Sequence, residues 1–194
     1  MKRKMMRKLL LSIFLLTTLG LSAQDVTMRD MFKQMPDSLS PYLTANNRLD
    51  FIDFIDSNMN AEVTNSLGGK SRMLKLTDKY AEIALNEASS VAMLLLPVSE
   101  PVDSTSQILC MIRTYGKDVQ ESTVEFYSAK WRRLQASYYL APVQDMVVAT
   151  VDEATLSMTL TPVYRLDPPA NEEQKVIAKP QMKLKWEGKF ANER

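Results

Sequence analysis

The chain has 194 residues, among them 24 basic and 23 acidic ones, one cysteine and no histidine. The absence of histidine excludes Ser-His-Asp and Cys-His mechanisms of hydrolysis, and a single cysteine excludes an internal disulfide. A zinc site is not expected either, because cysteine and histidine are the usual zinc ligands.

Residues 1–23 are predicted to be a signal peptide that is not part of the folded domain. Five of the first eight residues are basic, and the apolar run Leu9–Leu21 that follows is too short to cross a bilayer. Cleavage is expected after Ala23, with cleavage after Ser22 as the alternative. No second long apolar run follows. We therefore expect a soluble protein in the periplasm or outside the cell that does not span a membrane.

Removal of the leader changes the charge balance of the chain. Residues 24–194 carry 19 basic and 23 acidic side chains, a net charge of −4. A mildly acidic chain without a basic stripe is not expected to bind nucleic acid. We expect 24–194 to be a single α+β domain, with a helical part at 25–70 and a β-rich part at 71–194.

Two helices are predicted in the helical part. The first, Asp25–Met35, has apolar residues at spacings of three and four and ends before Pro36. A brief helical start is expected at Ser40-Pro41, with Ser40 as its N-cap. Asn46 or Asn47 is expected to cap the second helix.

The apolar faces of these helices are expected to fill a core. The inner face of the second helix is predicted to comprise Leu49, Ile52, Ile55 and Met59, with Phe51 and Phe54 beside them. Four methionines are placed on the inner faces of the two helices: Met28, Met31, Met35 and Met59. Flexible thioethers suit such core positions.

From position 72 onward the apolar pattern changes to a period of two, which indicates strands. The predicted strands are Arg72–Leu76, Lys79–Asn86, Ser89–Leu96, Gln107–Tyr115, Ser122–Ser128, Ser137–Leu140, Asp145–Asp152, Thr155–Leu166 and Gln181–Lys189. Long helical patterns are missing between them, which favours an antiparallel meander. Cys110 lies on the apolar side of its strand and is predicted to be buried. Pro162 lies within a strand pattern, which indicates an edge strand or a bulge.

One internal similarity links two turns of the β-rich part. Asn86-Glu87-Ala88-Ser89 is matched by Asp152-Glu153-Ala154-Thr155. The match has two explanations: an old duplication of a hairpin, which would give two related sub-sheets, or two hairpins that use the same turn chemistry.

Three carboxylates of the second helix are the candidate catalytic residues. Asp50, Asp53 and Asp56 are spaced by three and therefore lie near one another on a helix surface. Paired carboxylates perform acid–base chemistry when burial raises the pKa of one of them, but solvated helix faces have the same spacing. Asp56, Asn58 and Asn60 match three ligand positions of a calcium loop that lacks its usual glycine and final glutamate. We expect a solvated face, with no bound metal or cofactor.

An aromatic and basic segment is the candidate surface for a partner. Trp131 is followed by Arg132 and Arg133, and Tyr138-Tyr139 comes shortly after. Such residues are enriched in protein interfaces. Strand residues in the core of a sheet explain the same pattern, so both interpretations stay open at this point.

Parts of the chain resemble a known family. The residues that carry the resemblance are Met35-Pro36-Asp37-Ser38-Leu39, Asn46-Asn47-Arg48-Leu49-Asp50, Leu67-Gly68-Gly69-Lys70-Ser71 and the region from Tyr127 to Trp131. They are similar to an uncharacterised family of small exported proteins from Bacteroidetes-type Gram-negative bacteria, labelled as a domain of unknown function. The resemblance implies export and a single-domain protein, and it carries over no catalytic residue, ligand or partner.

We expect an α+β fold in which short N-terminal helices pack on an antiparallel, meandering sheet. The expected function is non-enzymatic binding of a protein partner or of an apolar, lipid-like ligand in the cell envelope. One alternative is a carboxylate-dependent hydrolase of glycans or peptides that uses Asp50, Asp53 or Asp56. Another is a subunit of an envelope assembly. The sequence leaves the ligand, the partner and the oligomeric state open.

Overall fold

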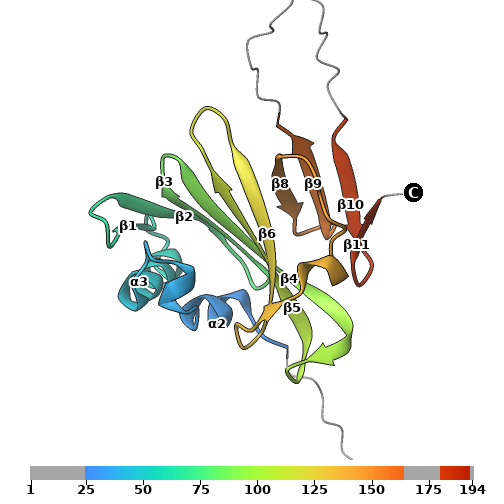
Figure 1. Ribbon diagram of the computed structural model, residues 1–194. Helices are drawn as coiled ribbons and strands as arrows, with labels where there is room; N and C mark the ends of the chain where they lie inside the picture. The colour runs from blue at the N-terminus through green and yellow to red at the C-terminus, as the bar shows by residue number, and fades with distance from the viewer. Residues whose placement is uncertain (1–24, 164–179, 193–194) are drawn as a thin grey trace, which may run out of the picture.

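The computed structural model describes residues 25–163 and 180–192, so the predicted signal peptide lies outside the described residues. Two antiparallel sheets and a few short helices form three layers: the helices, a seven-stranded sheet and a four-stranded sheet (Figure 1). The expected class, α+β with antiparallel sheets, is confirmed.

The helical layer consists of α2 (Met28–Lys33), the 3₁₀ helix η1 (Asp37–Leu39) and α3 (Ala45–Asp56). The hydroxyl of Thr44 accepts the backbone N–H of Asn47, and the side chain of Asn47 accepts the backbone N–H of Thr44. This capping box satisfies donors that the start of a helix leaves without partners. The predicted cap at Asn46 or Asn47 is wrong, because Thr44 is the N-cap of α3.

Two other helix predictions also need correction. The predicted helix Asp25–Met35 is shorter at both ends, because the Thr27 side chain caps α2 by accepting the N–H of Asp30. The helical start predicted at Ser40-Pro41 is absent, since Ser40 ends η1 instead of beginning a helix.

The buried face of α3 differs from the predicted one. Phe51 and Ile52 are buried as predicted, but 46% of Leu49 and 58% of Met59 are exposed. α3 ends at Asp56, so Met59 lies beyond the helix and its period no longer applies. The third buried residue is Arg48, which donates to Asp37 and to the carbonyl of Leu43, both at 2.9 Å.

The seven-stranded sheet is a meander in which each strand pairs with the next one in the chain. Its strands are β1 (Glu62–Thr64), β2 (Lys70–Leu76), β3 (Tyr80–Asn86), β4 (Ser89–Val102), β5 (Thr105–Tyr115), β6 (Glu121–Ser128) and β7 (Arg133–Leu134). β1 and β7 were not predicted, because three and two residues are too few to show a period. β1 also places a strand inside the predicted helical part, 25–70.

The four-stranded sheet has the order β11-β10-β9-β8. Its strands are β8 (Val147–Asp152), β9 (Ser157–Pro162), β10 (Met182–Trp186) and β11 (Phe190–Asn192). The predicted strand Ser137–Leu140 is wrong, because this segment contains the 3₁₀ helix η2 (Ala136–Tyr138).

Pro162 ends β9, a central strand, so neither the predicted edge strand nor a bulge is present. β10 pairs with β9 only as far as Leu160. Proline has no N–H to donate, but β10 has no described residue paired with position 162, so the ladder loses no hydrogen bond there.

Two hydrophobic cores lie on the two faces of the seven-stranded sheet. The first contains Phe32 and Phe51 from the helices together with Met93 and Leu95 of β4. The second joins Leu94 and Leu96 of β4 to the four-stranded sheet. Neighbouring residues of β4 thus enter different cores, which follows from the alternation of side chains along a strand. Cys110 lies in the second core with no exposed surface, as predicted.

The two similar turns share one side-chain hydrogen bond but differ in length, with two residues between Asn86 and Ser89 and four between Asp152 and Ser157. The Asn86 side chain accepts the N–H of Ala88 at 2.8 Å in the β3–β4 hairpin. The Asp152 side chain accepts the N–H of Ala154 at 2.7 Å in the β8–β9 hairpin. Shared Asx-turn chemistry is sufficient to explain the sequence match. A duplication that relates the two sheets stays a prediction.

Candidate functional site

The three predicted catalytic carboxylates lie on the exposed side of α3. Asp50 and Asp53 face solvent, and both oxygens of Asp56 accept hydrogen bonds from the Arg29 guanidinium, at 2.8 and 2.9 Å. None of the three lines the clefts described below. An exposed ion pair of this kind contributes about 0.5 kcal/mol to stability. Their catalytic role stays an untested prediction.

The candidate calcium ligands follow the end of α3. The carboxylate of Asp56 is already engaged by Arg29, while Asn58 has a left-handed backbone with φ of 53°. Asn60 is exposed, and its carbonyl accepts the N–H of Glu62. Within residues 25–163 and 180–192, no group of three or more Asp, Glu, His or Cys side chains is placed to hold a metal ion.

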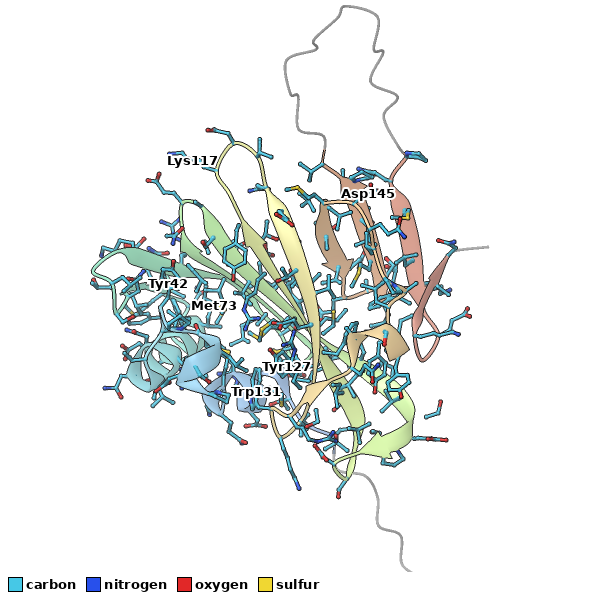
Figure 2. The ribbon with its side chains drawn as sticks, in the orientation of Figure 1. Tyr42, Met73, Lys117, Tyr127, Trp131 and Asp145 are labelled. Carbon is cyan, nitrogen blue, oxygen red and sulfur yellow. The ribbon has the colours of Figure 1, made fainter. Side chains whose placement is uncertain are left out.

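A cleft of about 700 Å³ opens between η1 and the end of the seven-stranded sheet. We name it the β6 cleft, and its main lining residues are Pro36, Leu39, Arg113, Tyr115, Thr123, Glu125, Tyr127, Trp131 and Arg133. Figure 2 shows Tyr127 and Trp131 close together at the end of β6 nearest to α2. The cleft therefore combines ionic and aromatic side chains from three consecutive strands.

Glu125 is the centre of an ion cluster in this cleft. Its carboxylate pairs with Arg113 and, at 2.8 Å, with Arg133, and it accepts the hydroxyl of Tyr127 at 3.1 Å. Arg113 also donates to the carbonyl of Leu39 at 3.0 Å, which ties the strand to η1. The side chains of Arg113 and Glu125 are only 15% and 16% exposed, whereas Arg133 is 72% exposed. Two guanidinium groups around one carboxylate leave a net positive charge.

Trp131 is held by a tight turn between β6 and β7. The Ser128 hydroxyl accepts the N–H groups of Lys130 and Arg132, both at 3.3 Å, and the Ser128 carbonyl accepts that of Trp131. Trp131 has φ of 60°, a conformation that costs a non-glycine residue about 1 kcal/mol. Its ring lies 5.7 Å from that of Tyr127, centroid to centroid.

The indole of Trp131 keeps a free donor. Its Nε1 is buried and has no hydrogen-bond partner among the described residues. A buried N–H without an acceptor is costly, and backbone strain is found mainly at functional positions. Both features of Trp131 therefore identify the turn as part of a candidate site.

Burial shifts the pKa of two side chains, one that lines the β6 cleft and one in the second core. Burial raises the pKa of the Tyr127 hydroxyl, which Arg113 opposes and the Glu125 charge reinforces. Burial also raises the pKa of the Cys110 thiol. Tyr127 therefore stays a hydrogen-bond donor at neutral pH, and Cys110 is not a nucleophile.

Two further hollows are lined by the segment 135–146, which connects the seven-stranded sheet to the four-stranded one. The first, of about 370 Å³, is lined by residues that include Ser122 and Val124 of β6 and Val147 of β8, and we name it the edge hollow. The second, of about 740 Å³, is the apolar hollow, and its lining includes Tyr139, Leu140, Met182, Leu184 and Phe190. The two share the segment from Leu140 to Val143.

The aromatic and basic segment divides between surface and core. Trp131 and Arg133 line the β6 cleft, and Arg132 instead pairs with Asp103 at 3.0 Å. Tyr138 is 70% exposed, while the ring of Tyr139 packs in the second core. Sequence patterns alone did not identify Arg113 and Glu125, because only the β5–β6 register brings them together.

Among the helices of the described residues, none has the length and apolar content to cross a membrane. No curated protein gave a significant match to the chain. Among solved structures, a domain of an uncharacterized protein from Porphyromonas gingivalis W83 has a similar fold, with a TM-score of 0.67 and 18% sequence identity. The match covers 88% of this chain and 99% of that one, and at this identity it shows the fold alone.

The family comparison agrees with the resemblance seen in the sequence. The family described as "Protein of unknown function (DUF3256)" matches residues 18–187, which is most of the chain. The chain therefore belongs to the DUF3256 family.

Proposed function

We propose that this chain is an exported, non-enzymatic protein of the cell envelope that binds a segment of a partner protein in the β6 cleft. The observation that carries the proposal is the ion cluster of Arg113, Glu125 and Arg133 beside the Trp131 indole. Arginine and tryptophan are the residues that most often dominate the free energy of protein binding.

The ion cluster favours binding over catalysis. Both oxygens of Glu125 are already engaged: Oε2 accepts hydrogen bonds from Arg113 and Tyr127, and Oε1 forms the ion pair with Arg133. A general base needs a carboxylate oxygen that is free to reach the proton of a substrate, and both oxygens of Glu125 are already engaged within the protein. Arg133, which is 72% exposed, offers positive charge to a ligand, and Trp131 lines the same cleft with its aromatic ring. An acidic group of the partner would complement the charge of Arg133.

The proposed export rests on the leader at 1–23, with its basic start and its apolar run. N-terminal sequencing of the protein from separated cell fractions tests this part. A mature chain that begins at position 24 or 23 in the periplasmic or extracellular fraction is expected. An intact leader on a cytoplasmic protein would contradict it.

Site-directed photo-crosslinking in intact cells tests the proposed function. A benzophenone amino acid replaces Thr123, an exposed residue of the cleft, and in a control replaces Asp53, an exposed residue of α3. We expect a discrete protein adduct from position 123 and none of the same mass from position 53. Equal adducts from both positions, or none from position 123, would contradict the proposal.

A second candidate function is the binding of an apolar ligand. The observation in its favour is the apolar hollow beside Leu140 and Phe190, whose volume suits a small hydrophobic molecule. Extraction of the purified native protein with organic solvent, followed by mass spectrometry, tests it. A stoichiometric lipid-sized compound would favour this function over the first.

A further inference from the structure

The edge of the seven-stranded sheet next to the β6 cleft is incompletely paired. β7 pairs with β6 only at Phe126 and Tyr127, while β6 continues back to Glu121. After Leu134 the chain leaves the row of β7 and enters η2. The first half of β6 therefore has no strand beside it in this sheet among the described residues.

The hydrogen-bond alternation shows which backbone groups face this open edge. The N–H of Gly116 donates to the carbonyl of Ala88, so the even-numbered residues of β5 bond to β4 and the odd-numbered ones to β6. In β6 the odd-numbered residues then bond to β5. Ser122 and Val124 consequently turn their N–H and C=O groups outward, as Ser128 does when it donates to Arg132. Within the described residues, the backbone N–H and C=O groups of Ser122 and Val124 have no hydrogen-bond partner.

Both sides of this edge are hollow. Thr123 and Glu125 line the β6 cleft, Ser122 lines the edge hollow, and Val124 lines both. β8 lies under the edge on the side of the second core, where the N–H of Ala149 donates to the Ser122 hydroxyl at 3.0 Å. An extended chain would thus have room for its side chains on each side.

We propose that an extended peptide segment of the partner adds to the sheet as a strand beside Ser122–Val124. This proposal rests on the proposed function and specifies the form in which the partner binds. Main-chain hydrogen bonds provide affinity in such strand addition, and alternate side-chain pockets provide specificity. The guest strand occupies the row of β7 beyond Leu134, where β7 ends.

The two hollows determine the side-chain pattern of the guest strand. Guest residues opposite Val124 point into the edge hollow, whose walls include Leu140, Val143 and Val147. We expect these guest residues to be apolar. Guest residues on the other face point toward Trp131 and the net positive cluster, so they are acidic. The recognised segment therefore alternates apolar and acidic residues.

A second copy of this chain fits the edge less well. In an antiparallel β6–β6 pair, the outward backbone groups are all used when Ser122 of each copy lies opposite Val124 of the other. This register also places Glu121 of each copy opposite Glu125 of the other. Like charges directly opposite one another destabilise a strand pair.

The test combines a peptide probe with a backbone variant. The probe is a fluorescein-labelled seven-residue peptide in which valine alternates with aspartate, and its control is an isomer with consecutive valines. Val124→Pro removes one outward N–H without removing a bond to β5, and proline is tolerated where a strand N–H faces away from its neighbour. Val124→Thr keeps the N–H and is the matched control.

Fluorescence anisotropy is expected to show binding of the alternating peptide and weaker binding of the isomer. Val124→Pro should weaken binding about tenfold, and Val124→Thr should leave it nearly unchanged. In the wild-type protein, amide exchange at Val124 should slow when the peptide is added. This second measurement holds even if the proline variant does not fold.

Unchanged affinity in folded Val124→Pro, unchanged amide exchange at Val124, or no binding of the alternating peptide at millimolar concentration would each overturn strand addition. Failure of strand addition and failure of the proposed function are distinguishable. An adduct from position 123 that persists in the Val124→Pro background overturns strand addition alone. The absence of that adduct in the otherwise unchanged protein overturns the proposed function.

Discussion

Replacing Glu125 by glutamine should destabilise the fold more than breaking one of the exposed ion pairs described above. The substitution keeps the size of the side chain and removes the charge that Arg113 and Arg133 share. Because Arg113 is only 15% exposed, its charge is left poorly solvated in the variant. Breaking a fully buried pair costs about 3–5 kcal/mol, and an exposed pair less than about 1 kcal/mol. The partial burial here places Glu125→Gln at about 2–3 kcal/mol.

Urea unfolding followed by circular dichroism measures this loss of stability. Glu87→Gln is the matched control, because the Glu87–Lys117 pair has side chains that are 85% and 66% exposed. The control should lose little stability, because an ion pair between exposed side chains is screened by solvent. Arg133→Ala, which removes only the exposed partner, should also stay below about 1 kcal/mol. Equal losses in Glu125→Gln and Glu87→Gln would refute the reasoning that the cluster is a partly buried, coupled unit.

Three further predictions follow from other parts of the structure. The backbone N–H groups of Ala154 and Thr155 lower the pKa of Asp152 in the folded protein. The contribution of Asp152 to the free energy of unfolding is therefore complete above its pKa in the unfolded chain, and it is lost as the pH falls through its pKa in the folded protein. Urea midpoints should therefore fall more between about pH 5 and pH 3 in the wild type than in Asp152→Asn; parallel curves would contradict this. Gly116→Ala should destabilise by at least about 2 kcal/mol, because φ is +110° and a Cβ atom would overlap the carbonyl of Val119. Thermal unfolding with Gly69→Ala as the nearly neutral control checks it, and similar midpoints would refute it. Cys110 should react with a thiol reagent only in denaturant, since it has no exposed surface, and rapid labelling of the native protein would disprove its burial.

The strands with the strongest patterns were predictable, and so was the burial of Cys110. β4 and β5 are long, and their residues enter both cores, so their apolar content was evident in the sequence. The class of fold followed from short turns and missing helical periods. The face of α3 was harder to predict, because Arg48 is buried through its bonds to Asp37 and Leu43, whereas Leu49 is exposed. A charged residue satisfied by tertiary contacts has no signature in a hydrophobic pattern.

The candidate site depended on tertiary information that the sequence does not contain. Arg113 faces Thr123 in the ladder and Met111 faces Glu125, so the ion pair is a diagonal one across two strands. A shift of one residue in register would turn these side chains to the other face. Trp131 was visible as an aromatic residue beside arginines, but its left-handed backbone and its free N–H appear only in the structure.

Native mass spectrometry of the protein, gently extracted from its own cells, tests the proposed binding role most directly. Arg133→Ala removes a charge from the β6 cleft, and Arg132→Ala removes a neighbouring charge that pairs with Asp103 outside it. We predict that the mass of a partner protein stays with the wild type and with Arg132→Ala and is lost from Arg133→Ala. A bare monomer in the wild type, or equal retention of the partner by both variants, would contradict the account.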